Sequence, residues 1–153
     1  MTISKTITLA NGVEMPRLGY GVFRMKEHDV AFTGVTEALQ AGYRAIDTAA
    51  IYQNEEAVGA AIKASSVPRE ELFITTKVWN ADQGYDNTLR AFEVSLKKLG
   101  LDYLDLYLTH WPKAQLADTY KAIERLYEEK LIRVPGVSNH HQHHLEEIFA
   151  TAN

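Results

Sequence analysis

The feature that most constrains the fold is a regular alternation of short apolar runs with amphipathic stretches of helical period. Five such pairs follow one another along the 153-residue chain. The apolar runs predict strands over residues 18–23, 43–47, 73–77, 103–110 and 131–137. The amphipathic stretches predict helices from near Asp29, Asn54, Asn87 and Gln115, and a fifth around residues 145–149. Alternation of this kind is typical of a parallel α/β sheet.

The spacing of apolar residues also predicts which helix faces are buried. For the first helix these residues are Ala31, Val35, Ala38 and Leu39. For the fourth they are Leu116, Tyr120, Ile123 and Tyr127, and for the fifth Leu145, Ile148 and Phe149.

A β-hairpin is expected over residues 5–16, ahead of the first strand–helix pair. Asn11 and Gly12 lie between two β-prone segments, and both residue types tolerate the positive φ of a tight turn. No linker or low-complexity segment divides the chain. We therefore expect a single domain over residues 1–153, with the hairpin followed by βα units over residues 18–153.

Composition excludes several classes of protein. The net charge is -4 and the 16 basic residues are scattered, which is unlike a nucleic-acid-binding face. Without cysteines, the chain has no disulfide framework and no thiolate ligand or nucleophile. Neither a signal peptide nor an apolar run of membrane-spanning length is present in the sequence, so no membrane association and a cytoplasmic location are expected.

Two architectures compete for five βα units. Length favours a doubly wound sheet, because a closed eightfold barrel needs ~250 residues. However, Asp47, Lys77 and His110 lie at the carboxyl ends of the second, third and fourth expected strands. In barrel order these strands are neighbours ~4.8 Å apart, whereas the common doubly wound order inserts the first strand between the second and third. The polar residues therefore favour a partial (β/α)8 barrel.

These residues form an array suited to carbonyl reduction when Tyr52, shortly after the second strand, is added. Each has an ordinary structural interpretation when it is taken alone, as a packing tyrosine, a structural ion pair or a rim histidine. Together, a phenol could protonate a developing alkoxide, and the Lys77 ammonium would lower the phenol's pKa. Asp47 would hold the lysine, and His110 could bind the substrate oxygen.

Four runs resemble the aldo-keto reductase family, in order and at similar spacing. They are GYRAIDTAAIY (42–52), FITTKVW (73–79), LDLYLTHWP (104–112) and GVSN (136–139). Within that family the sequence is most similar to those of the prokaryotic diketogluconic acid reductases. The resemblance implies a TIM barrel and reduction of an aldehyde, ketone or keto-sugar acid with NADPH.

The resemblance also implies individual roles. Tyr52 would donate the proton, with Asp47, Lys77 and His110 completing the catalytic set. A larger group would bind cofactor or substrate. Expected cofactor-binding residues are Gly21, Val22, Phe23, Asp47, Ser138 and Asn139, and expected substrate-binding residues are Phe23, Ile51, Trp79, His110 and Trp111.

Two other signals are rejected. The pair Gly19 and Gly21 is not a dinucleotide fingerprint, because Arg24 occupies the position of its third glycine. Four histidines over residues 140–144 have no carboxylate or thiolate arranged with them, so no physiological metal is expected.

The family's last three strands have no counterpart before Asn153. These strands would supply a glutamine, an aromatic platform for the nicotinamide and the basic segment for the 2′-phosphate. One alternative to the enzyme is therefore an inert remnant that acts as an interaction module. Open sheet edges also lead us to expect a homodimer or swapped assembly.

Overall fold

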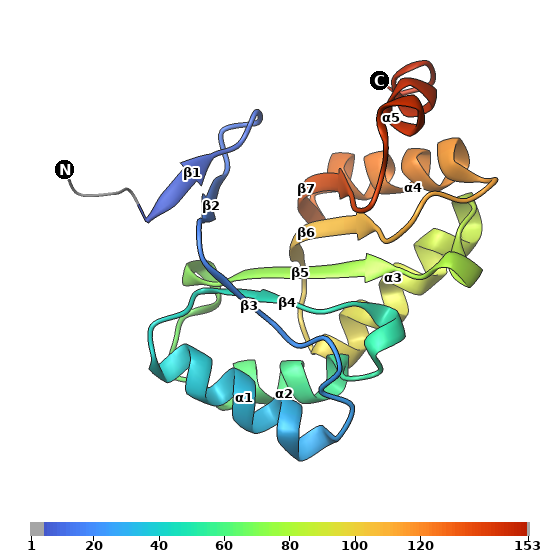
Figure 1. Cartoon of the computed structure of the whole chain (residues 1–153). Coiled ribbons are helices and arrows are strands. Elements are labelled where there is room, and N and C mark those ends of the chain that lie inside the picture. Colours follow the sequence, from blue (N-terminus) through green and yellow to red (C-terminus); the bar gives the residue numbers. More distant parts are fainter. Residues whose placement is uncertain (1–4, 153) are drawn as a thin grey trace.

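Five parallel strands form one sheet in the order in which they occur along the chain (Figure 1). The computed structural model describes residues 5–152. The sheet comprises β3 (Gly19–Gly21), β4 (Ala45–Asp47), β5 (Phe73–Val78), β6 (Leu104–Thr109) and β7 (Ile132–Val137). This sequential order confirms the partial barrel and excludes the doubly wound order, in which the first strand would separate the next two.

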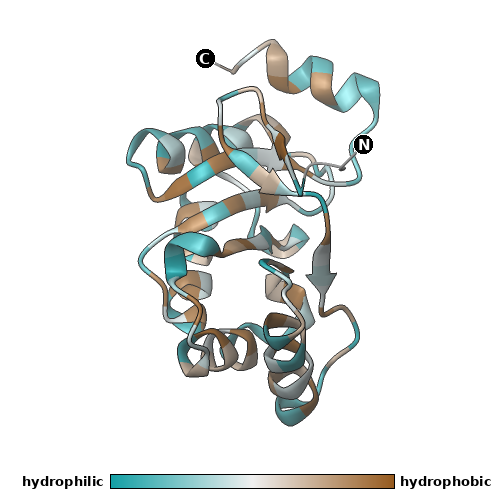
Figure 2. Cartoon of the chain, turned by 90° about the vertical axis from the view of Figure 1, so that its left-hand side faces the viewer, coloured by the Kyte–Doolittle hydropathy of each residue, from teal (hydrophilic) through white to brown (hydrophobic). Residues whose placement is uncertain are grey.

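Five helices follow the strands. They are α1 (His28–Gln40), α2 (Glu55–Ala64), α3 (Tyr85–Leu99), α4 (Leu116–Glu128) and α5 (Gln142–Phe149). Figure 1 shows α1 to α4 along one face of the sheet, and Figure 2 shows α5 near the C-terminus, where it contacts α4. Among residues 5–152, no helix combines the length and apolarity needed to cross a membrane.

The hydrophobic core lies between the sheet and its covering helices. Strand residues of this core include Ile46, Ile74 and Ile132, and helix residues include Val35, Val58, Phe92 and Ile123. All four apolar residues predicted for the buried face of α1 are buried. Tyr127 and Phe149, however, are exposed, so their predicted burial is wrong. In α4, Leu126 fills the core position that the prediction gave to Tyr127.

Two helix starts differ from the prediction. The residue before α1 is Glu27, so Asp29 lies within the first turn, where its charge favours the positive end of the helix dipole. Helix α3 begins at Tyr85, earlier than the expected Asn87. Gly84 has a φ of 103°, and this left-handed conformation lets the chain turn into the helix at that point.

The N-terminal hairpin forms a separate two-stranded sheet of β1 (Thr6–Thr8) and β2 (Glu14–Pro16). It lies within the range expected from the sequence. Asn11, at its turn, donates a hydrogen bond from Nδ2 to the carbonyl of Arg133 at 2.9 Å. The hairpin is therefore tied to β7, the strand farthest from it in sequence.

Candidate active site

The centre of the candidate site is an ion pair between neighbouring strands. Lys77 Nζ lies 2.6 Å from Asp47 Oδ1 and donates a second hydrogen bond to the Thr48 carbonyl at 2.9 Å. In β4 and β5, side chains alternate between faces, so Ile46 and Ile74 enter the helix-covered core while Asp47 and Lys77 take the opposite face. The Lys77 side chain is nearly buried, whereas that of Asp47 is 44% exposed.

A short 3₁₀ helix, η1 (Ala50–Tyr52), brings Tyr52 over this pair. The Lys77 ammonium lies 5.2 Å from the centre of the Tyr52 ring. Gln53 ends the turn in the left-handed conformation, with a φ of 58°, which redirects the chain into α2. The structure thus brings together the phenol, ammonium and carboxylate that the sequence predicted to be neighbours.

His110 directly follows β6 and completes the array. Its ring lies 5.7 Å from that of Tyr52 in an edge-on arrangement and 5.3 Å from that of Trp79. The side-chain amide of Asn139 donates to the His110 carbonyl at 2.9 Å, which fixes the backbone at this point. All four predicted catalytic residues therefore lie at the carboxyl end of the sheet.

The acidity of Tyr52 differs from the prediction. Burial, followed by the negative charge of Asp47, raises the pKa of Tyr52 above its ordinary value of 10.0. Lys77 was expected to lower that pKa; its ammonium lies 5.2 Å from the centre of the ring and bonds to Asp47, whose negative charge acts in the opposite sense. The phenol is therefore fully protonated at neutral pH and is available as a proton donor.

The pKa of His110 is lowered from its ordinary value of 6.5. Burial is the main cause and the Lys77 charge the second, while Asp47 opposes them. Nδ1 of this ring is buried and has no hydrogen-bond partner among the described residues. The imidazole is therefore neutral at neutral pH and carries one N–H, which can donate to an incoming oxygen.

Aromatic and aliphatic side chains surround the array. The Phe23 ring lies 5.1 Å from that of Tyr52 and is 63% exposed. Ile51 and Trp111 are also exposed near it. Val22 was expected to line the same mouth, but its side chain is wholly buried in the core, so that prediction is wrong for the side chain. Gly21, at the end of β3, pairs with Asp47 across the strands.

Ser138 and Asn139 lie after β7, beside His110. Asn139 has a φ of 61°, and its Nδ2 bonds both the His110 carbonyl and Ser138 Oγ. Its Oδ1 has no hydrogen-bond partner within residues 5–152. The amide oxygen of Asn139 and the hydroxyl of Ser138 thus remain for a ligand. A carboxamide, which both donates and accepts hydrogen bonds, fits this pair of groups.

Sequence analysis did not identify Asn54 as part of the site. It was expected to mark a helix start and follows the family-like run that ends at Tyr52, yet its side chain does not cap α2. Instead, Asn54 Nδ2 donates to the carbonyls of Val22 and Met25 at 3.0 and 3.1 Å, and Oδ1 accepts from the Thr48 hydroxyl at 2.6 Å. Asn54 therefore joins the loop of Phe23 to the turn of Tyr52. An asparagine two residues after the tyrosine was the available signal.

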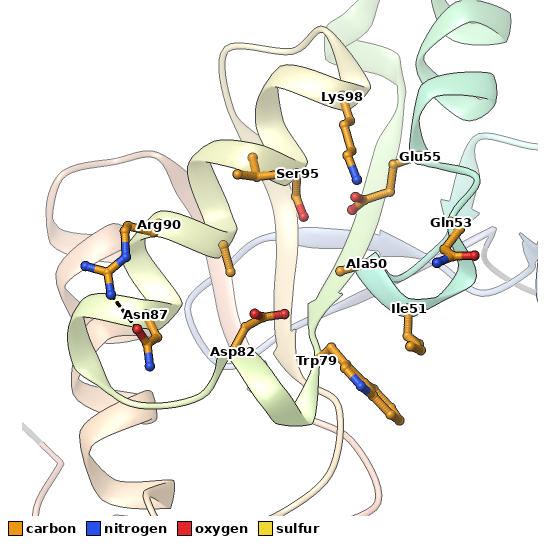
Figure 3. A pocket seen from close by; sticks show the side chains of 12 residues that line it. Ala50, Ile51, Gln53, Glu55, Trp79, Asp82, Asn87, Arg90, Ser95 and Lys98 are labelled. Carbon is orange, nitrogen blue, oxygen red and sulfur yellow. Dashed lines mark hydrogen bonds between the residues drawn. The ribbon is translucent and has the colours of Figure 1, made fainter.

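A cavity of about 330 Å³ lies between η1 and α3, and Ile51 and Trp79 are part of its lining (Figure 3). Its lining mixes charges: Glu55 and Asp82 are acidic, and Arg90 and Lys98 are basic. The buried Glu55 carboxylate accepts a hydrogen bond from the Thr76 hydroxyl at 2.6 Å. Because its charges balance, this cavity favours neither anions nor cations.

Histidines 140, 141, 143 and 144 lie at the start of α5. Within the part of the chain that the structure describes, no three histidine or carboxylate side chains are arranged to hold a metal ion. Mutual repulsion adds to desolvation in lowering the pKa of His144 below 6.5. The rings crowd one another without converging on a common point, and the closest pair of centres, His143 and His144, is 3.8 Å apart.

The chain matches a known family, curated proteins and solved structures. The model of the "Aldo/keto reductase family" matches residues 17–153. Glyoxal reductase of Bacillus subtilis is 57% identical over 99% of this chain and 55% of its own length. Methylglyoxal reductase DkgA of Salmonella typhimurium is 50% identical over 93% of this chain and 52% of its own length. The chain spans about half the length of the curated relatives it matches.

Solved structures agree. An aldo-keto reductase from a Medee basin deep-sea metagenome superposes with a TM-score of 0.93 at 54% identity, covering 96% of this chain and 54% of that one. A Bombyx mori aldo-keto reductase solved in complex with NADP has a TM-score of 0.90 at 35% identity, covering 99% of this chain and 56% of that one.

Proposed function

The chain belongs to the aldo/keto reductase family, and from that premise we propose that it carries the proton-donating half of an NADPH-dependent carbonyl reductase. The substrate would be an aldehyde, a ketone or a keto-sugar acid. The observation that carries the proposal is the Lys77–Asp47 pair, 2.6 Å long, lying beneath the Tyr52 ring with the His110 ring beside it. The names of the glyoxal and methylglyoxal reductases support it.

In this proposal the bound nicotinamide supplies the hydride, and the chain's own residues manage the oxygen of the substrate. The Tyr52 hydroxyl and the His110 N–H would bind the carbonyl oxygen together. As that oxygen becomes an alkoxide, a far stronger base than a phenolate, Tyr52 would transfer its proton to it. Lys77 would stabilise the phenolate that remains, and Asp47 would hold Lys77 in place.

The residues present fit one end of the cofactor. Asn139 Oδ1 and Ser138 Oγ offer an acceptor and a hydroxyl beside His110, as a nicotinamide carboxamide requires. Among the related structures, the Bombyx mori aldo-keto reductase was solved in complex with NADP. That a second copy of the chain covers the edge strands β3 and β7 remains a prediction. Light scattering would test it by measuring the mass of the protein in solution.

Replacing Tyr52 by phenylalanine tests the proposal. The variant Tyr52→Phe keeps the ring and loses the proton, so we expect methylglyoxal reduction to fall by about 10²–10⁴-fold. NADPH binding, followed by cofactor fluorescence, should persist in the variant. Near-normal reduction would assign the proton donor elsewhere. Absence of NADPH binding to the unaltered chain would favour the inert interaction module instead.

A further inference from the structure

The cavity between η1 and α3 lies outside the proposed catalytic array (Figure 3). Its volume of about 330 Å³ is at the lower end of the range of small-molecule sites. Four charged side chains line it, two of each sign: Glu55, Asp82, Arg90 and Lys98. None of the four forms an ion pair within residues 5–152. These charges balance without neutralising one another, so they remain available to a ligand.

Two buried polar groups of the lining have unused hydrogen-bonding capacity. Glu55 is 2% exposed, and only one of its carboxylate oxygens, Oε1, has a partner among the described residues, the Thr76 hydroxyl. Ser95 is 1% exposed, and its hydroxyl has no hydrogen-bond partner in that part of the chain. Exposed charges are usually only solvated, whereas buried polar groups nearly always have partners. A ligand in the cavity would satisfy both groups.

The two acids of the lining lie near one point. Burial raises the pKa of the Tyr107 hydroxyl, and the negative charges of Glu55 and then Asp82 raise it further. Both carboxylates therefore lie close to this hydroxyl, which is itself buried and without a hydrogen-bond partner in the described chain. An ammonium group in this part of the cavity would be attracted by two negative charges and could donate to the free oxygen of Glu55.

Lys98 supplies a charge of the opposite sign. Figure 3 shows the Lys98 ammonium and the Glu55 carboxylate pointing toward one another, although the two do not form an ion pair. Ser95 precedes Lys98 by three residues on α3, so both side chains lie on the same face of the helix. A molecule that carries an ammonium and a carboxylate on one carbon atom could therefore bridge the space between Lys98 and Glu55.

We propose that this cavity binds a free amino acid with an apolar side chain. Its ammonium would donate to Glu55, and its carboxylate would accept from Lys98 and Ser95. Asp82 would add a second negative charge near the ammonium. The side chain would lie against three apolar residues of the lining, which are Ala50, Ala91 and Val94. The site is distinct from the proposed catalytic array, because none of the four catalytic candidates lines it.

Three small molecules with the same branched alkyl chain test the proposal by calorimetry. Leucine carries both charges, isoamylamine keeps only the ammonium, and isocaproate keeps only the carboxylate. Titrated at neutral pH, the unaltered protein should bind leucine about tenfold more tightly than either of the others, because each of these lacks one charged contact. Leucine binding that is undetectable, or no tighter than that of the other two, would overturn the proposal.

Neighbouring residues supply matched controls. Glu55→Gln and Lys98→Gln should each weaken leucine binding about tenfold. Glu56→Gln and Lys97→Gln remove the same charges from exposed positions outside the lining and should leave the affinity unchanged. Asp82→Asn, at an exposed position, keeps the test decisive if Glu55→Gln does not fold, and it should weaken binding by a smaller factor. Equal losses in Lys98→Gln and Lys97→Gln would show that Lys98 does not hold the ligand.

A last variant separates this cavity from the expected substrate mouth. Trp111 is exposed near that mouth and does not line the cavity, so Trp111→Ala should bind leucine as tightly as the unaltered protein. Weaker binding in this variant would place leucine in the substrate mouth and overturn the proposed site. The titration uses neither NADPH nor a carbonyl compound, so its result does not depend on the proposed function.

Discussion

The two ends of the five-stranded sheet each carry a charge cluster, and the clusters are built differently. At the amino end, Asp105 is wholly buried, and its two carboxylate oxygens accept bonds from Arg69, Arg133 and the Ile74 amide, all at 2.8–2.9 Å. At the carboxyl end, Asp47 meets a single cation, Lys77, and is nearly half exposed.

A structural cluster differs from one that can act on a ligand because the hydrogen-bonding atoms of its acidic group all have partners. Both oxygens of Asp105 have partners, so its carboxylate is not open to a ligand, and the one unpartnered atom of this cluster within residues 5–152, Nε of Arg69, is buried. Around Asp47, by contrast, the His110 ring has an unpartnered Nδ1 within the described chain, and the pKa values of Tyr52 and His110 are displaced. In barrels of this kind the amino end serves stability and the carboxyl end carries the loops that act.

The largest effect on stability is expected from disrupting the Asp105 cluster at the amino end of the sheet. Asp105→Asn leaves two arginines facing a neutral group in the interior, and the free energy of unfolding should fall by about 3–5 kcal/mol, as measured by chemical denaturation. Glu129→Gln, which breaks the exposed pair with Arg125, is the control and should leave stability unchanged within error. Similar losses in both variants would show that the Asp105 cluster does not hold the fold.

The carboxyl end should respond in activity more than in stability. Lys77→Met keeps the length of the side chain but removes the charge that would stabilise a Tyr52 phenolate, so kcat for carbonyl reduction should fall about 100-fold. Water can solvate the half-exposed Asp47, so stability should fall much less than in Asp105→Asn. A loss of stability as large as that of Asp105→Asn, with kcat retained, would reverse the comparison between the two ends.

Asn54 lies at the carboxyl end of the sheet, but both polar atoms of its side chain have hydrogen-bond partners. Its replacement should therefore affect both stability and activity. Asn54→Ala leaves the Met25 carbonyl and the Thr48 hydroxyl without partners, while the Val22 carbonyl keeps its bond from the Met25 amide, at a cost of about 1–3 kcal/mol in stability. The loop of Phe23 also loses its anchor, so KM for the carbonyl substrate should rise. Asn87→Ala, at an exposed site in α3, is the control. An unchanged KM would limit Asn54 to a structural role.

The smallest expected effect is the change of stability with pH that His110 causes. Because the folded-state pKa of His110 lies below the ordinary 6.5, the unfolded chain takes up this proton first as pH falls, and the stability that neutral His110 contributes above pH 6.5 declines below it. In Lys77→Met the pKa of His110 should rise, because a nearby cation has been removed. Titration of the His110 ring by NMR would measure this, and an unchanged midpoint would mean that the two groups are not coupled.

The sequence predicted the sheet, and the nearness of the four candidate catalytic side chains, for a physical reason. Residues 73–78 form an unbroken β-prone run, and the alternation of strands and helices fixes which residues end on the same edge. Tyr127 and Phe149 were misplaced because helical period identifies a face but not its centre. The bonds of Asn54 and the raised pKa of Tyr52 depend on distances between segments, which no local pattern contains.

The bond from Asn11 to the Arg133 carbonyl spans 122 positions of sequence. Contacts so remote in sequence form late, because the entropy of closing a long loop must first be offset by other interactions. During synthesis, the opening hairpin leaves the ribosome long before its anchoring carbonyl exists. The hairpin, which is made before the five strands of the sheet, is therefore among the last segments to be secured, and its docking would report that those strands have assembled.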